Sequence, residues 1–187
     1  CGYGEILKHS LIANKTFFNF LERNISKILK LQSPYIEKAI LESCRIKKNV
    51  VEKDEKEKSL RKVLNFGHTF AHAFEAALGF SKKLNHGEAV ILGMNTALGF
   101  SKQNKFLKND DYRLVKKHLE NSKLPHNIKN YFSLKDVNKI LSFMIKDKKN
   151  KTDKINLVLL KKIGHPTIKN QYNKNYLKSF LKNQLMN

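Results

Sequence analysis

Hydrophobic residues recur at helical spacing along most of the chain. In residues 16–31, for example, Phe17, Phe18, Leu21, Ile25, Ile28 and Leu29 fall one, three or four positions apart. Three or four residues is the spacing of one face of an α-helix. Similar patterns predict helices over residues 3–13, 59–78, 88–103, 110–121 and 134–146.

Two further helices are expected. Pro34 fits the first turn of a helix that continues to about Val51, because proline at that position loses no helical hydrogen bond. The charged stretch 53–58 is predicted to be a loop, and the polar tail from Asn170 is predicted to form a last helix.

One stretch has the character of a strand. Residues 155–161 include Ile155, Leu157, Val158, Leu159 and Leu160, a short and largely branched apolar run. There is no internal repeat and no linker rich in Pro, Gly or Ser. The pattern therefore predicts a mainly α fold, organised as one helical domain over residues 1–187, with at most a short strand near 155–161.

Composition narrows the function classes. The formal net charge is +21, which raises the possibility of a nucleic-acid partner. The excess is mainly lysine spread over nearly every segment, however, and no basic cluster is interleaved with stacking aromatic residues. Nucleic-acid binding is therefore only weakly supported.

Nothing in the sequence indicates membrane insertion or secretion. No apolar run reaches the ~18 residues that a transmembrane helix needs, and the first residues lack the pattern of a signal peptide. The two cysteines, Cys1 and Cys44, show neither zinc spacing nor a disulfide framework, which favours a reducing, cytoplasmic setting. The opening Cys1-Gly2-Tyr3-Gly4 lacks an initiator Met, and we expect the chain to be part of a longer protein.

A polar stripe interrupts the apolar pattern between residues 61 and 75. Arg61, Asn65, His68, His72 and Glu75 follow one another at steps of four, three, four and three. On one continuous helix this spacing would stack them on a single face. Burying such a stripe without partners would cost several kcal/mol, so a metal, an anion or a substrate is one interpretation. A stripe that faces water is the other.

A third histidine strengthens the interpretation as a metal site. His86 precedes an apolar helix in the segment Leu84-Asn85-His86-Gly87-Glu88, so it should lie near that helix's N-terminus. A histidine supplied from a second helix is what a zinc site with an open position requires. Glu5 is the available carboxylate, although its position alone also suits a solvent-facing glutamate.

The order of several motifs resembles one enzyme family. They are Gly-Tyr-Gly-Glu5-Ile-Leu-Lys8, Arg45-Ile-Lys47, Asp54-Glu-Lys-Glu57, Leu60-Arg61-x-x-Leu64-Asn65-Phe-Gly-His68-Thr-Phe-x-His72, His86-Gly-Glu and Asp147-Lys148-Lys149. Together they are similar to the C-terminal, metal-binding half of the 3-dehydroquinate synthases. The similarity covers essentially the whole chain and is densest from 42 to 94. Ala71 stands where many members have glycine, and close helix packing should survive because both residues are small.

The resemblance implies a role for each matching residue. Glu5, His68 and His86 match zinc ligands, and the same ligand types would accept cobalt. Lys8, Lys47 and Arg61 match residues that bind the carboxylate and hydroxyls of the substrate, while Asn65, His72 and Lys148 match residues that contact its phosphate. His72, linked through water to Glu57, also matches the proton-relay position.

The implied activity is that of an NAD- and metal-dependent lyase of the shikimate pathway. It converts 3-deoxy-D-arabino-heptulosonate 7-phosphate, a small sugar-acid phosphate, into 3-dehydroquinate and phosphate. In the family NAD binds an α/β N-terminal domain, which residues 1–187 do not contain, so the isolated chain should be inactive. The resemblance also implies a homodimer.

Other functions remain open. A different sugar-phosphate cyclase, or a metal-dependent polyol dehydrogenase of the same fold, would share the zinc ligands, but Arg61 and Lys47 favour a substrate that bears a carboxylate. A basic helical module that binds nucleic acid is the alternative of a different class.

Overall fold

The computed structural model describes residues 2–146 and 154–186, and most of them are helical. The α-helices are α1 (Gly2–Ala13), α2 (Lys15–Leu29), α3 (Tyr35–Lys53), α4 (His68–Ala77), α5 (His86–Gln103), α6 (Asn109–Asn121), α7 (Val137–Lys146) and α8 (Lys174–Met186). Three 3₁₀ turns, η1 (Leu60–Asn65), η2 (Ile128–Asn130) and η3 (Leu134–Asp136), lie between them. The prediction of a mainly helical fold is confirmed.

Helix α5 forms the centre of the domain, with α1 and α4 packed against it. Almost every α5 side chain from Ala89 to Ser101 is buried, as expected for a helix that is apolar around most of its circumference. Its start is fixed by a capping box. The Asn85 side chain accepts a hydrogen bond from the Glu88 N–H at 3.1 Å, and the Glu88 carboxylate accepts one from the Asn85 N–H at 3.0 Å.

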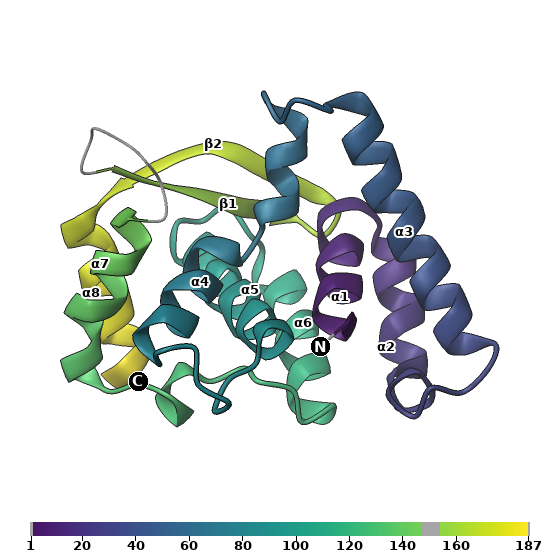
Figure 1. The fold of residues 1–187 in the computed structure, drawn as a ribbon, viewed down its shortest axis with the longest axis horizontal. Helices are drawn as coiled ribbons and strands as arrows, with labels where there is room; N and C mark the ends of the chain where they lie inside the picture. The colour runs from purple at the N-terminus through teal and green to yellow at the C-terminus, as the bar shows by residue number, and fades with distance from the viewer. Residues whose placement is uncertain (1, 147–153, 187) are drawn as a thin grey trace.

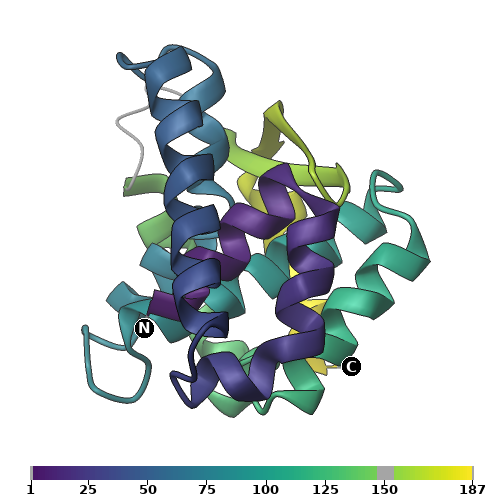
Figure 2. The same ribbon diagram turned by 90° about the vertical axis from the view of Figure 1, so that its right-hand side faces the viewer.

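The other elements surround this centre (Figure 1). Helices α7 and α8 lie on one side, and α1, α2 and α3 lie on the other. Figure 2 faces that second side, where α3 stands beside α2. Only Ala39 and Ser43 of α3 are buried, so much of this helix contacts solvent.

The C-terminal region contains a hairpin rather than one strand. β1 (Lys154–Lys162) pairs antiparallel with β2 (His165–Asn173). β1 packs against α5 through its apolar residues. β2 is mostly polar, so its sequence does not show the apolar pattern of a strand. The turn uses Gly164 at φ 84°, and its N–H donates to the Leu11 carbonyl at 2.8 Å. The expectation of at most one short strand was therefore incomplete.

The predicted continuous helix over residues 59–78 is wrong. The chain forms η1 up to Asn65, breaks at Phe66-Gly67, and begins α4 at His68. Gly67 has φ 80°, and a Cβ built there would lie 2.7 Å from the Met94 backbone nitrogen. The polar stripe is thus divided, with Arg61 and Asn65 on η1 and the remaining members on α4.

Helices α4 and α5 approach closely at Gly93. A Cβ built on Gly93 would meet the Gly67 carbonyl oxygen and would lie 2.8 Å from the Ala71 backbone nitrogen. Ala71 itself is fully buried. Close packing is therefore retained with alanine at position 71, because Gly93 supplies the space.

In the described part of the chain, no helix has both the length and the apolar character required to cross a membrane.

Candidate metal centre and substrate site

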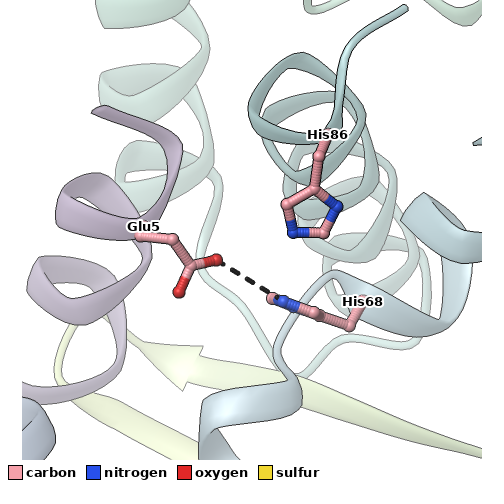
Figure 3. A group of neighbouring side chains, drawn as sticks. All are labelled: Glu5, His68 and His86. Carbon is pink, nitrogen blue, oxygen red and sulfur yellow. Dashed lines mark ion pairs between the residues drawn. The ribbon is translucent and has the colours of Figure 1, made fainter. Parts of the chain in front are cut away.

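Three side chains from three different helices meet at one point. Glu5 comes from the first turn of α1, His68 opens α4 and His86 opens α5. One ligand atom from each lies within 4.8 Å of the other two, and Figure 3 shows the three side chains turned toward a common space. Their helices can come this close because a Cβ on Gly4 would lie only 2.6 Å from the Gly87 carbonyl oxygen.

The histidine rings are oriented for ligation through Nε2. His68 Nδ1 lies 3.2 Å from the Phe66 carbonyl oxygen, and His86 Nδ1 lies 3.1 and 3.3 Å from the two carboxylate oxygens of Glu75. Both partners can only accept a hydrogen bond, so in the neutral rings Nδ1 carries the proton. The Nε2 lone pair is then available for a metal.

Glu5 supplies an oxygen without a conventional hydrogen bond. Its Oε2 accepts from Lys8 Nζ at 2.7 Å, whereas the buried Oε1 has no hydrogen-bond partner and lies 3.5 Å from His68 Nε2. Two ligands of a tetrahedral zinc ion at about 2 Å are separated by about 3.3 Å. The donor set of two imidazoles and one carboxylate therefore fits a zinc or cobalt ion after small adjustments.

The electrostatic environment keeps this carboxylate ionised. Partial burial by itself raises the pKa of Glu5, but the polar contact with His68 and the hydrogen bond and charge of Lys8 outweigh it. The net result is a pKa well below the ordinary value for glutamate. Burial in turn lowers the pKa of Lys8, which the contact with Glu5 partly offsets. An ionised carboxylate is the form that binds a metal.

His72 borders the same space from the next turn of α4. Its ring centroid lies 5.4 Å from that of His68 and 6.4 Å from that of His86. A third imidazole close to the ligand group can bind or transfer a proton to a molecule held there.

The η1 segment is organised by one carboxylate. Asp54 accepts hydrogen bonds from the backbone N–H groups of Lys58, Ser59 and Arg61 at 2.8 to 2.9 Å. These bonds lower the pKa of Asp54 below its ordinary value, the bond from Arg61 contributing most. The Arg61 guanidinium donates to the Glu55 carbonyl at 2.7 Å. These hydrogen bonds hold the loop of residues 54–59 against η1.

Asn65 and Glu57 lie together at the edge of a cavity. Asn65 Nδ2 donates to Glu57 Oε1 at 2.9 Å. The cavity has a volume of about 730 Å³ and lies between η1 and the hairpin; it is lined by Glu57, Lys62, Asn65, Asn156, Leu157, Val158, Ile168 and Gln171. Among the described residues that line it, none belongs to the group of Glu5, His68 and His86, so the metal group lies beyond this cavity rather than within it.

The other predicted substrate-binding lysines differ in their position relative to the metal group. Lys8 is buried beside Glu5, and Lys47 lies on the exposed side of α3, near enough to Lys8 for their charges to interact. Lys148 lies outside the described residues. The structure thus brings Glu5, Lys8, His68, His72 and His86 together, while their roles in ligation and substrate binding stay predictions.

Comparison with known proteins settles the family. Residues 2–150 match the family model described as 3-dehydroquinate synthase C-terminal. The chain belongs to this family. It is 60% identical over 185 residues to a 3-dehydroquinate synthase from Pelagibacter ubique, with 99% of this chain and 50% of that protein covered. It is 39% identical over 189 residues to one from Bradyrhizobium diazoefficiens, with 98% and 49% covered. The chain spans about half the length of the curated relatives it matches.

Two solved structures share the fold of this chain. A 2-epi-5-epi-valiolone synthase from Streptomyces hygroscopicus, with NAD⁺ and Zn²⁺ bound, has a TM-score of 0.81 at 20% identity, over 98% of this chain and 50% of that one. A 2-deoxy-scyllo-inosose synthase, complexed with carbaglucose-6-phosphate, NAD⁺ and Co²⁺, has a TM-score of 0.78 at 24% identity, over 97% and 50%. At these identities the likeness concerns the fold alone.

Sequence reasoning gave no separate role to Glu75 in this 3-dehydroquinate synthase domain. The residue was one member of the polar stripe, and its contact with His86 links two helices that are separated by a turn at Gly79 and Phe80. Both turn residues have positive φ values, 65° and 54°. No short sequence spacing identifies such a contact, because it depends on the angle at which the two helices meet.

Proposed function

We propose that the chain is the metal- and substrate-binding part of a 3-dehydroquinate synthase. That enzyme would convert 3-deoxy-D-arabino-heptulosonate 7-phosphate into 3-dehydroquinate and phosphate in aromatic amino-acid biosynthesis. The observation that carries the proposal is the convergence of Glu5, His68 and His86, with ligand atoms within 4.8 Å of one another, in a chain of this family. The 60% identity to the Pelagibacter ubique relative supports the same conclusion.

Glu5, His68 and His86 would hold a Zn²⁺ or Co²⁺ ion. When bound, the ion would polarise substrate oxygens and lower the free energy of a developing alkoxide. The ammonium group of Lys8 donates to Glu5 Oε2 at 2.7 Å, and another of its three N–H groups would bind a substrate oxygen. We assign substrate carboxylate and hydroxyl binding to Lys8, Lys47 and Arg61, with arginine suited to bidentate contact.

We assign phosphate binding and proton transfer to a second set of residues. Asn65, His72 and Lys148 would contact the phosphate, and His72 would transfer protons with Glu57 through water. An imidazole can both accept and donate a proton, so it is suited to this work. The hydrogen bond from Asn65 to Glu57 links the end of η1 to the loop before it, which supports this assignment. Much of the remaining rate enhancement would come from orientation of the bound substrate.

The complete activity requires more than this domain. NAD, which would take up a hydride from the substrate and later return it, would bind the half that the curated relatives have in addition. We therefore propose that the chain alone is inactive and that the whole enzyme is a cytoplasmic homodimer. Dehydroquinate formation by these 187 residues in isolation would contradict this part of the proposal.

The decisive experiment uses the protein expressed from its complete gene. It is supplied with NAD, zinc and the seven-carbon sugar-acid phosphate, and release of phosphate is followed together with dehydroquinate. Both products should appear and should be lost on chelation or in His68→Ala. Glu120→Ala, a change on the distant helix α6, is the matched control and should retain activity.

A sister cyclase is the second candidate, because the two solved structures described above are a 2-epi-5-epi-valiolone synthase and a 2-deoxy-scyllo-inosose synthase. If the protein binds metal but yields neither product, sugar phosphates without a carboxylate become the substrates to test. Arg61 and Lys47 favour the first proposal, since such substrates would leave them without an anionic partner.

A further inference from the structure

Glu75 lies behind His86, on the opposite side from the group of ligand atoms. Its two carboxylate oxygens are 3.1 and 3.3 Å from His86 Nδ1. In Figure 3 the other ring nitrogen of His86 is turned toward Glu5 and His68. The imidazole therefore stands between a carboxylate and the proposed metal position.

The two histidines of the group are held by different means. His68 is 15% exposed, and its Nδ1 faces the backbone carbonyl of Phe66, two residues away on the same segment. His86 is 50% exposed and lies at the first position of α5. Half of its side chain is open to solvent, so packing restricts its ring less than that of His68 and its orientation depends more on a hydrogen bond.

Glu75 is suited to provide that hydrogen bond. Its side chain is only 13% exposed, and α4, which carries it, is packed against α5. Ordering a glutamate on a well-packed helix costs less additional entropy than ordering one on a loop. A carboxylate at Nδ1 also increases the basicity of the opposite nitrogen.

We propose that Glu75 is a positioning residue for the metal centre. It accepts the Nδ1–H of His86, fixes the tautomer and direction of the ring, and so presents Nε2 to an ion shared with Glu5 and His68. The inference rests on the proposed function to the extent that an ion occupies this group. Glu75 acts through His86 and is not itself a ligand: the described residues that can converge on one ion are Glu5, His68 and His86.

The first test needs no metal. Nitrogen NMR of the metal-free protein, produced from its complete gene and studied at alkaline pH where imidazole is neutral, reports which ring nitrogen of His86 carries the proton. The wild type should show the Nδ1–H tautomer, and Glu75→Ala should shift His86 toward Nε2–H. A wild-type ring in the Nε2–H form, or no change in the variant, would overturn the proposal.

The second test measures metal affinity by competition with a chelator. Glu75→Ala should weaken binding of Zn²⁺ or Co²⁺ by about 10- to 100-fold, the usual effect of losing a hydrogen-bond partner of a ligating histidine. Glu75→Gln should recover part of the loss, because its amide oxygen still accepts from Nδ1–H. Glu120→Ala, which removes the same charge on α6, should leave the affinity unchanged.

The absorption spectrum of bound Co²⁺ separates positioning from direct ligation. At saturation, Glu75→Ala should keep the band intensity that corresponds to the wild-type coordination number. An altered coordination number would make Glu75 a ligand, and unchanged affinity in Glu75→Ala would show that it does not support the site. Either result overturns the proposal.

The two tests also separate this inference from the proposed function. If the wild-type protein binds no ion, the proposed function fails, and the tautomer of His86 still decides whether Glu75 orients the ring. If the ion binds tightly in both wild type and Glu75→Ala, the metal centre stands and the role of Glu75 fails.

Discussion

Several ionisable residues on or beside α1 are buried, and each has a specific partner. Lys8 contacts Glu5, His9 Nδ1 lies 2.7 Å from Ser43 Oγ, and His118 Nε2 lies 2.7 Å from the Tyr3 hydroxyl oxygen. Burial lowers the pKa of His118 to about 4 and, with the nearby charge of Lys8, also lowers that of His9 to about 4. Both imidazoles are therefore neutral in the folded protein at neutral pH.

The depressed pKa of His118 predicts acid sensitivity. The unfolded chain binds a proton at about pH 6.5, whereas the folded chain binds it only near pH 4. Acidification through this window therefore favours the unfolded state. The contribution of His118 to the free energy of unfolding should fall by about 2 kcal/mol between about pH 7 and about pH 5.

Urea denaturation at several pH values measures this effect. His118→Gln should be less stable near neutral pH, since packing against Phe18 is altered, but its stability should depend less on pH than that of the wild type. The remaining dependence would come from His9 and other groups. Equal pH slopes in wild type and His118→Gln would show that His118 is not buried in its neutral form.

At the residue scale, the sequence was sufficient to predict the three residues of the metal group but not all of their hydrogen bonds. Residue types and motif order were sufficient to nominate Glu5, His68 and His86, which do lie together. The hydrogen bond from His86 to Glu75 was not predictable, because it needs the relative position of two helices. The Tyr3–His118 pair is separated by 115 residues and was missed for the same reason.

At the scale of elements, two glycines on α5 provide an internal comparison. A Cβ on Gly93 would collide with the backbone of α4 at Gly67 and Ala71, whereas a Cβ on Gly99 would have its nearest neighbour, Gln184 Oε1, at 3.7 Å. Both positions are in the interior of one helix. They therefore share the helix-propensity effect and differ in the available space.

We expect opposite effects from the same substitution at these positions. Gly99→Ala should stabilise the domain by about 0.5–1 kcal/mol through helix propensity. Gly93→Ala should destabilise it by roughly 1–2 kcal/mol, since the steric clash costs more free energy than the higher helix propensity of alanine contributes. Chemical denaturation of the two variants checks the prediction. Similar stability of Gly93→Ala and Gly99→Ala would mean that α4 and α5 are not in close contact.

The errors in the predicted elements have physical causes. Hydrophobic periodicity continues across residues 59–78 and gives no sign of a break, yet Gly67 adopts a left-handed conformation and divides the stretch. The strand β2 was missed because Thr167, Asn170 and Gln171 do not alternate with apolar residues. In both cases tertiary packing, against Met94 and against β1, decided the local conformation.

For the molecule as a whole, the net charge of +21 should allow weak binding to nucleic acid, and this predicts how the nucleic-acid alternative can be tested. Lysines spread over the surface should give only non-specific binding, with a dissociation constant of about 10⁻⁴–10⁻⁶ M and a steep decline as salt rises. A filter or fluorescence assay with duplex DNA and RNA checks this. Sequence-selective nanomolar binding that is unaffected by His68→Ala would instead favour a nucleic-acid function over a metal centre.

The metal centre joins parts of the chain that are distant in sequence. Glu5, His68 and His86 lie in the first turns of α1, α4 and α5, and both α1 and α4 pack against α5. An ion bound to all three residues therefore connects these helices in the folded state and not in the unfolded chain. Ligand-linked stabilisation follows directly. Zn²⁺ at about 100 times its dissociation constant should add about 2.7 kcal/mol to the free energy of unfolding.

For a protein about twice as long as this chain, that stabilisation corresponds to an increase in Tm of about 2–5 °C. Thermal unfolding of the protein from its complete gene, with zinc and then with excess chelator, measures the shift. His68→Ala and His86→Ala should lose most of it, because each leaves two of the three donors, while Glu120→Ala should keep it. Full stabilisation by zinc in both histidine variants would place the bound ion elsewhere on the molecule.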